Sequence, residues 1–214
     1  MVTKNDFHRV GWEEYGSTME KILKKVSSYI AKNHLKIDAV VPILRGGSTL
    51  GSFLAYRLNL LRVLPVQYKY FFVGDRKAEL REILFTPKKN MFVTDPVFLL
   101  VEGDQCFGNT VIAVAKKLKK MFPKCKIINV ADCIDYTYQN ASRPYVDKII
   151  YGELTNHCEG LSKDKCDKLN IGKSLIAPWE NYEEEIATLS GKQFKYSDIV
   201  PTKNKSIKKA TFKF

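Results

Sequence analysis

The segment VFLLVEGDQCFGNT, residues 97–110, constrains the fold more than any other part of the sequence. Residues 97–101 are continuously apolar, which is typical of a parallel strand buried on both faces at the centre of a sheet. The acidic residue Glu102 follows this strand, and Gly108 then allows a tight loop before Thr110 begins a helix. A strand, a glycine turn and a helix in this order predict an α/β domain with parallel strands.

The rest of the sequence repeats this alternation of strands and helices. Apolar residues recur at intervals of three and four over residues 12–32, which predicts an amphipathic helix. The other expected elements are strands at 39–44, 63–70, 127–131, 148–151 and 174–176, and helices at 48–58, 110–121 and 183–189. This alternation predicts a doubly wound parallel sheet of about five strands with helices on both faces. Ligands of such sheets bind at the carboxyl ends of the strands.

The length of 214 residues and a hydrophobic content of 45% allow one substantial core. We therefore expect one domain over residues 1–190 and a lysine-rich tail over 191–214. The polar stretch 74–90 has no firm period, so we expect a flexible loop over residues 71–96 or a hairpin within it. We expect residues 152–173 to be an insertion between two strands.

The net charge of +12 indicates an anionic partner without identifying it. Lysines gather on the predicted helix 110–121 and in the tail. They are either a nucleic-acid-binding surface or solvated side chains on an ordinary protein surface, and both interpretations stay open.

The sequence indicates a cytoplasmic protein with no membrane partner. No run approaches the roughly 18 to 20 apolar residues that span a bilayer, and the first nine residues lack the apolar core of a signal peptide. The five cysteines are odd in number and widely spaced, so we expect reduced thiols rather than disulfides.

The loop at residues 102–110 is a candidate phosphate site. Backbone N–H groups and the N-terminus of the following helix would point at one spot, which suits a phosphate group. The alternative is a structural strand-to-helix turn with a required glycine, and the segment alone does not decide between the two.

The same segment resembles the signature of type I phosphoribosyltransferases, in which an apolar strand leads into two acids, two variable residues and Asp-Thr-Gly-x-Thr. LRGG at residues 44–47 resembles the pyrophosphate loop of that family. The stretches VGWEEY, RPYVDKIIYG and LIAPWE resemble the opening helix and the closing region of its xanthine-guanine branch. The resemblance spans residues 10–182 and implies the type I phosphoribosyltransferase fold with a small C-terminal hood.

The resemblance implies a site for phosphoribosyl pyrophosphate, from which the phosphoribosyl group passes to a nucleobase. The pyrophosphate would be bound by Leu44, Arg45, Gly46 and Gly47, with a cis peptide bond between Leu44 and Arg45. The phosphoribosyl part would contact Glu102, Gly103, Cys106, Phe107, Gly108, Asn109 and Thr110. Mg²⁺ is the implied cofactor, and Glu102 would contact it indirectly through the ligand.

Three residues depart from the family signature. Gly103 replaces the second acid, Cys106 replaces the catalytic aspartate and Phe107 replaces the threonine beside it. The implied catalytic residues are therefore Cys106, Glu102 and Asp104. Cys106 is either a reactive thiol whose pKa is lowered at a helix N-terminus or an inert cysteine.

The base site also departs from the pattern of oxopurine enzymes, because Asp132 begins the stretch where those enzymes have a lysine. The candidate base-binding residues are Asp132, Tyr136, Ser174, Leu175 and Trp179. Trp179 either contacts the base or packs in the core.

Two functions from different classes follow. The first is a phosphoribosyltransferase of unusual base specificity, expected as a homodimer by the habit of the family. The second is a catalytically impaired homologue that binds phosphoribosyl pyrophosphate or a nucleotide and acts through a partner, with nucleic acid as one such partner. A third function is another reaction on a nucleotide-like substrate, because a fold does not determine the function of a protein.

Overall fold

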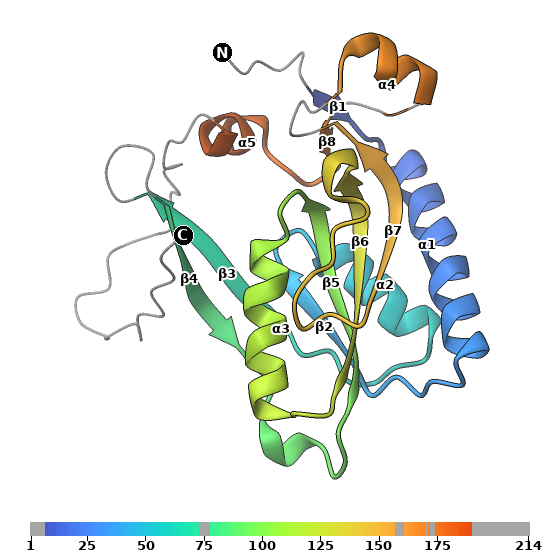
Figure 1. The fold of residues 1–214 in the computed structure, drawn as a ribbon, viewed down its shortest axis with the longest axis vertical. Helices are drawn as coiled ribbons and strands as arrows, with labels where there is room; N and C mark the ends of the chain where they lie inside the picture. Colours follow the sequence, from blue (N-terminus) through green and yellow to red (C-terminus); the bar gives the residue numbers. More distant parts are fainter. Residues whose placement is uncertain (1–6, 73–77, 157–160, 170, 172–173, 190–214) are drawn as a thin grey trace.

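The computed structural model describes residues 7–72, 78–156, 161–169, 171 and 174–189. Its centre is a six-stranded sheet in the order β4-β3-β2-β5-β6-β7 (Figure 1). The strands are β2 Ala39–Leu44, β3 Val66–Phe72, β4 Ala78–Phe85, β5 Val97–Gln105, β6 Lys126–Asp135 and β7 Lys148–Thr155. Five of them pair in parallel and β4 alone pairs antiparallel. The expected doubly wound parallel sheet of about five strands is confirmed, with one antiparallel edge strand added.

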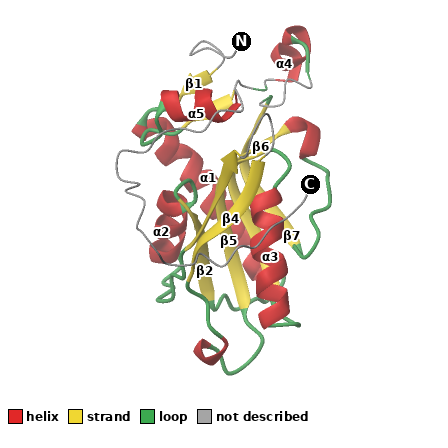
Figure 2. Ribbon diagram, turned by 90° about the vertical axis from the view of Figure 1, so that its left-hand side faces the viewer, coloured by secondary structure: helices red, strands yellow, loops and turns green. Residues whose placement is uncertain are grey.

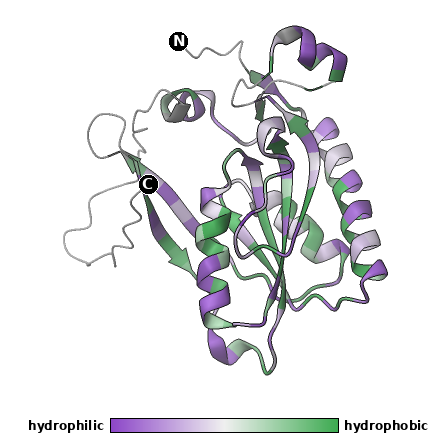
Figure 3. Ribbon diagram, in the orientation of Figure 1, coloured by the Kyte–Doolittle hydropathy of each residue, from purple (hydrophilic) through white to green (hydrophobic). Residues whose placement is uncertain are grey.

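Helices cover both faces of this sheet, as Figure 2 shows with the sheet turned. They are α1 Trp12–Lys32, α2 Ser48–Arg57 and α3 Asn109–Met121. Side chains of β5 alternate between two cores, as the period of a strand requires. Phe98 and Leu100 pack with α3, whereas Leu99 and Val101 pack with α1 and α2. Figure 3 shows the central strands as the most hydrophobic part of the molecule.

Strands β5 and β6 are longer than the sequence pattern predicted. They continue to Gln105 and Asp135 instead of ending at residues 101 and 131. The extra residues of β5 are polar or glycine, and those of β6 begin and end with an aspartate, so the apolar pattern is interrupted, but their backbones still pair, for example Asp104 with Cys133. The acidic residues at the strand ends are therefore held in the sheet and do not lie in loops.

Within the stretch 71–96, where we expected a flexible loop or a hairpin, residues 78–85 form β4 and a hairpin with β3. The local pattern hides this strand, because only Leu80 on it is fully buried. Contacts across the hairpin stabilise it instead, including a 2.6 Å hydrogen bond from the Tyr68 hydroxyl to Glu82. The tip of the hairpin lies outside the described residues.

A second, two-stranded sheet lies at the carboxyl ends of the central strands (Figure 1). It pairs β1 Phe7–Arg9 in parallel with β8 Ser174–Ile176, and α5 Tyr182–Leu189 follows. We call β1, β8 and α5 the hood. The sequence did not predict β1, because three residues are too few to show a period.

The remaining segments are only partly described. The insertion expected over residues 152–173 begins within β7 and contains helix α4 Lys163–Leu169, while parts of it lie outside the described residues. The tail at 191–214 lies entirely outside them. Among the helices that the structure describes, none combines the length and the apolar composition needed to cross a bilayer.

Replacing Phe98 with Ala should lower the free energy of unfolding by about 3–5 kcal/mol, because it would leave a cavity in the core. Phe98 is fully buried, and its ring packs edge-to-face against Phe92 and Phe122 at centroid distances of 5.4 and 5.7 Å. Urea denaturation measures this change. The control Val93→Ala removes a fully exposed side chain and should change stability by less than about 0.5 kcal/mol. Equal effects of the two variants would contradict the assigned core.

Candidate functional site

The loop after β2 packs directly against the end of β5. The peptide bond between Leu44 and Arg45 is cis, as the resemblance implied. A Cβ atom placed on Gly103 would lie 3.3 Å from the Cα of Gly46, and one placed on Gly47 would lie 2.2 Å from the carbonyl oxygen of Val101. The two backbones therefore approach too closely for side chains between them. A side chain at residue 103 would require Gly46 to shift by a few tenths of an ångström.

A second loop connects β5 to α3 and lines a cavity of about 170 Å³. Gly108, in the left-handed conformation with φ 70°, immediately precedes α3. Six of the seven residues expected to contact the phosphoribosyl group line this cavity: Glu102, Cys106, Phe107, Gly108, Asn109 and Thr110. Gly103 lies at the neighbouring cavity instead. The structure thus brings the motif residues together around one space beside a helix N-terminus.

Two buried polar side chains beside this loop have unused hydrogen-bonding atoms. Arg143 is 4% exposed and donates from Nη2 to the carbonyl oxygen of Cys106 at 3.0 Å. Its Nε and Nη1 atoms have no hydrogen-bond partner in the described part of the chain, and neither have the amide atoms of Gln105. Buried polar groups are usually hydrogen-bonded, so these atoms are open to a ligand or to water. Sequence analysis missed Arg143, although it opens the RPY stretch used for the resemblance.

Glu102 and Asp104 lie on β5 at the edge of this cavity, with Gly103 between them. Burial raises the pKa of Glu102 to about 8, and the backbone N–H of Gly103 partly opposes that effect. Asp104 is exposed and lines both this cavity and the next one. No group of three or more His, Cys, Asp or Glu side chains among the described residues is arranged to hold a metal ion.

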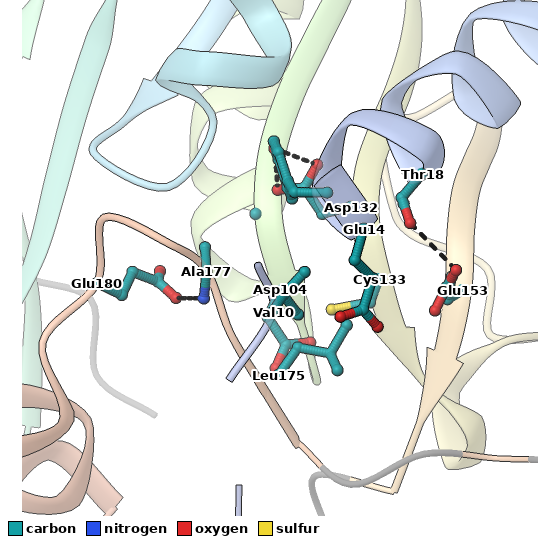
Figure 4. Close-up of a pocket in the computed structure, with 12 residues that line it drawn as sticks. Val10, Glu14, Thr18, Asp104, Asp132, Cys133, Glu153, Leu175, Ala177 and Glu180 are labelled. Atoms are coloured by element: carbon teal, nitrogen blue, oxygen red, sulfur yellow. Dashed lines mark hydrogen bonds between the residues drawn. The ribbon is translucent and has the colours of Figure 1, made fainter. Parts of the chain in front are cut away.

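The neighbouring cavity is lined by acidic side chains from several elements (Figure 4). Asp132 at the end of β6 accepts hydrogen bonds from the Tyr15 hydroxyl at 2.8 Å to both carboxylate oxygens. Glu153 accepts from Thr18 at 3.1 Å, and Glu180 accepts from the backbone N–H of Ala177 at 2.8 Å. Burial raises the pKa of Asp132 to about 8 and also raises that of Glu180. None of the described residues lining this cavity is a cation.

Of the expected base-binding residues, Asp132 and Leu175 line the acidic cavity. Tyr136 and Trp179 do not line it, although Trp179 contacts Tyr15, which does. The Trp179 ring packs edge-to-face against Tyr15, at a centroid distance of 4.7 Å. Of Ser174, the structure describes only the backbone, in β8.

Three charged side chains, Arg45, Lys69 and Glu184, pair with one another beside the loop after β2. Arg45 donates hydrogen bonds from Nη2 to Glu184 of α5, and Lys69 of β3 donates from Nζ to Oε1 of Glu184 at 2.6 Å. The Glu184 side chain is only 5% exposed. Sequence analysis identified Arg45 alone, because neither β3 nor α5 is near it in the chain.

Replacing Asp132 with Asn should flatten the dependence of stability on pH. The pKa of Asp132 rises from its ordinary 3.8 to about 8 on folding, so its stabilising contribution is complete below pH 3.8 and is lost as pH rises toward 8. The variant should therefore reduce the decline between pH 4 and 8 by up to about 1.4 kcal/mol per pH unit. Denaturation at several pH values measures this. The exposed Glu13→Gln should leave the slope unchanged, and an unchanged slope in Asp132→Asn would contradict the buried carboxyl.

No protein-family model matches the chain, and no curated protein matches its sequence. Solved structures, however, do match the chain. A purine phosphoribosyltransferase from Pyrococcus horikoshii Ot3 matches with a TM-score of 0.55 and 17% identity, over 83% of this chain and 95% of that chain. A xanthine-guanine-hypoxanthine phosphoribosyltransferase from Helicobacter pylori matches with a TM-score of 0.55 and 16% identity, over 85% of this chain and 99% of the other.

A hypothetical protein from Neisseria gonorrhoeae with bound ppGpp matches with a TM-score of 0.62 and 12% identity, over 86% of this chain and 94% of the other. The similarity to all three structures extends over most of each chain, although few residues are identical. The chain therefore has the type I phosphoribosyltransferase fold that its sequence motifs predicted.

Proposed function

We propose that this chain binds phosphoribosyl pyrophosphate with Mg²⁺ and transfers the phosphoribosyl group to a nucleobase. One observation carries the proposal: the glycine loop after β2 and the loop before α3 meet at the end of β5, with Glu102 beside both. The ligand has a pyrophosphate, a ribose and a 5′-phosphate in the same order. A site with two anion-binding loops and a carboxyl between them matches that order.

Each part of the site would have a distinct task. Backbone N–H groups at the start of α3 would bind the 5′-phosphate, with the positive charge of Arg143 behind them. Glu102 would accept hydrogen bonds from the ribose hydroxyls. Glu102 and Asp104 offer only oxygen donors, which suit Mg²⁺. The bound metal would neutralise charge on the pyrophosphate, and most of its ligands would come from the substrate.

The transfer breaks the bond between the anomeric carbon and a pyrophosphate oxygen and forms a bond from that carbon to a base nitrogen. The pyrophosphate leaves with the bonding electron pair, and the base nitrogen loses a proton. Asp104 lines both cavities, so in this proposal it would lie between the ribose and the base. We assign the proton to Asp104, because Cys106 stands where the family has its aspartate.

A second function is a regulatory protein that binds phosphoribosyl pyrophosphate or a nucleotide without turnover. Two observations favour it. Cys106, Gly103 and Phe107 replace three residues of the family signature, and the similar Neisseria gonorrhoeae structure holds ppGpp. Such a protein would act as a homodimer or through a partner on its lysine-rich surface. A nucleic acid there would bind with strong salt dependence.

Calorimetric titration with phosphoribosyl pyrophosphate and Mg²⁺ should give micromolar binding that Gly108→Ala weakens at least tenfold. Gly108 has a positive φ, and an added Cβ would lie 2.1 Å from Nε of Arg143, so the phosphate loop must distort. The control Lys120→Ala, on the exposed face of α3, should bind as the parent does.

The same titration separates the two functions. Release of pyrophosphate when a nucleobase is added supports the transferase, whereas binding of phosphoribosyl pyrophosphate or ppGpp without release supports the regulator. Absence of binding to either ligand would refute both.

If the transferase is limited by the missing aspartate, Cys106→Asp should raise the rate of pyrophosphate release at least tenfold, since a positioned general base typically contributes about 10²–10⁴-fold. Gly103→Asp, the other change toward the family signature, should instead weaken binding, because its Cβ would press on Gly46. Steady-state kinetics with a panel of bases measures both. A faster Gly103→Asp variant would contradict the assigned backbone contact.

A further inference from the structure

The pyrophosphate loop already holds an anion that belongs to the chain. Arg45 follows the cis peptide bond, and its guanidinium pairs with Glu184 from the hood. Lys69, from the middle of β3, pairs with the same carboxylate. Two cations from separate elements thus converge on one carboxylate, 139 and 115 residues away in sequence.

This cluster is arranged as an anion site with its anion in place. The carboxylate is 5% exposed, whereas the side chains of Arg45 and Lys69 are 60% and 34% exposed. An anion with more negative charge than a carboxylate would compete with Glu184 for these two cations. Pyrophosphate is such an anion.

Charged contacts hold helix α5 at this place, together with the edge-to-face contact of Tyr182 with Phe7. Among the side chains of α5 that the structure describes, Glu184 alone is fully buried. Its neighbours are acidic: burial raises the pKa of Glu185 to about 7, and the charges of Glu180 and Glu184 raise it further. A polyphosphate beside Arg45 would add negative charge to these acids and remove the cations that hold the helix. Figure 1 shows α5 beyond the carboxyl ends of the central strands, outside the six-stranded sheet.

We propose that Glu184 is an internal anion that occupies the pyrophosphate subsite, and that a polyphosphate ligand binds by displacing it together with helix α5. The inference rests on the proposed function, because it takes Arg45 as a pyrophosphate contact. It adds Lys69 to that subsite and makes α5 a self-inhibiting element. Affinity for the ligand is then lowered by the free energy needed to break the Glu184 contacts.

The test compares binding of inorganic pyrophosphate at low ionic strength to the parent protein, Glu184→Gln and Glu183→Gln. Glu184→Gln should bind at least tenfold more tightly, because the competing charge is gone. Glu183→Gln makes the same change one residue away, on an exposed side chain of the same helix, and should bind as the parent does. Adding Lys69→Ala to Glu184→Gln should abolish the gain.

Hydrogen exchange of the parent protein gives a second readout that does not depend on a variant. Saturating pyrophosphate should speed exchange of the backbone amides of α5. Slower exchange there would show that α5 stays in place over the ligand, and would overturn the displacement.

The outcomes separate this proposal from the proposed function. If Glu184→Gln binds pyrophosphate no better than the parent, the internal anion is refuted. The proposed function then still stands, provided that phosphoribosyl pyrophosphate binds in a manner sensitive to Gly108→Ala. If neither ligand binds any of these proteins, both proposals fail.

Discussion

The burial of β5 on both faces is the constraint on which the rest of the structure depends. Phe98 and Leu100 pack into one core and Leu99 and Val101 into the other, so the strand cannot rotate or slide. The same strand continues as Glu102, Gly103 and Asp104. Side chains at the end of a strand held in this way are placed without a contribution from the ligand. Catalysis and binding both gain from such preorganisation.

Gly103, which stands where the family signature has its second acid, packs its backbone against that of Gly46. The contact packs the loop after β2 against β5, and a Cβ at residue 103 would lie 3.3 Å from the Cα of Gly46. In the proposed function, acidic groups would be supplied instead by Asp104, one residue further along, and by Asp132 from the neighbouring strand. The site has therefore not simply lost an acid, because its carboxyls are arranged differently around the two cavities.

Charge is distributed unevenly around these cavities. The acidic cavity has no cation in its described lining, and burial keeps the pKa of Asp132 high. The cations lie elsewhere: Arg143 is buried behind the phosphate loop, and Arg45 pairs with Glu184 of the hood. A ligand that brings several negative charges to one end and hydrogen-bond donors to the other would complement both regions. This requirement unites the enzyme and the regulator, since both would bind phosphorylated ribose compounds.

The sequence by itself determined the central strand, the glycine loops and the parallel alternation, because each depends on residues adjacent in the chain, whereas the cis peptide bond was implied by the resemblance to the family. Only the tertiary structure decided the hairpin partner β4, the pairing of β1 with β8, and the contacts of Arg143, Lys69 and Glu184. In these cases the local pattern carries no signal: β1 is three residues long, and the charged partners are more than 30 residues apart in sequence. Apolar periodicity reports burial along one element, whereas a salt bridge between elements depends on where the whole fold brings their side chains together.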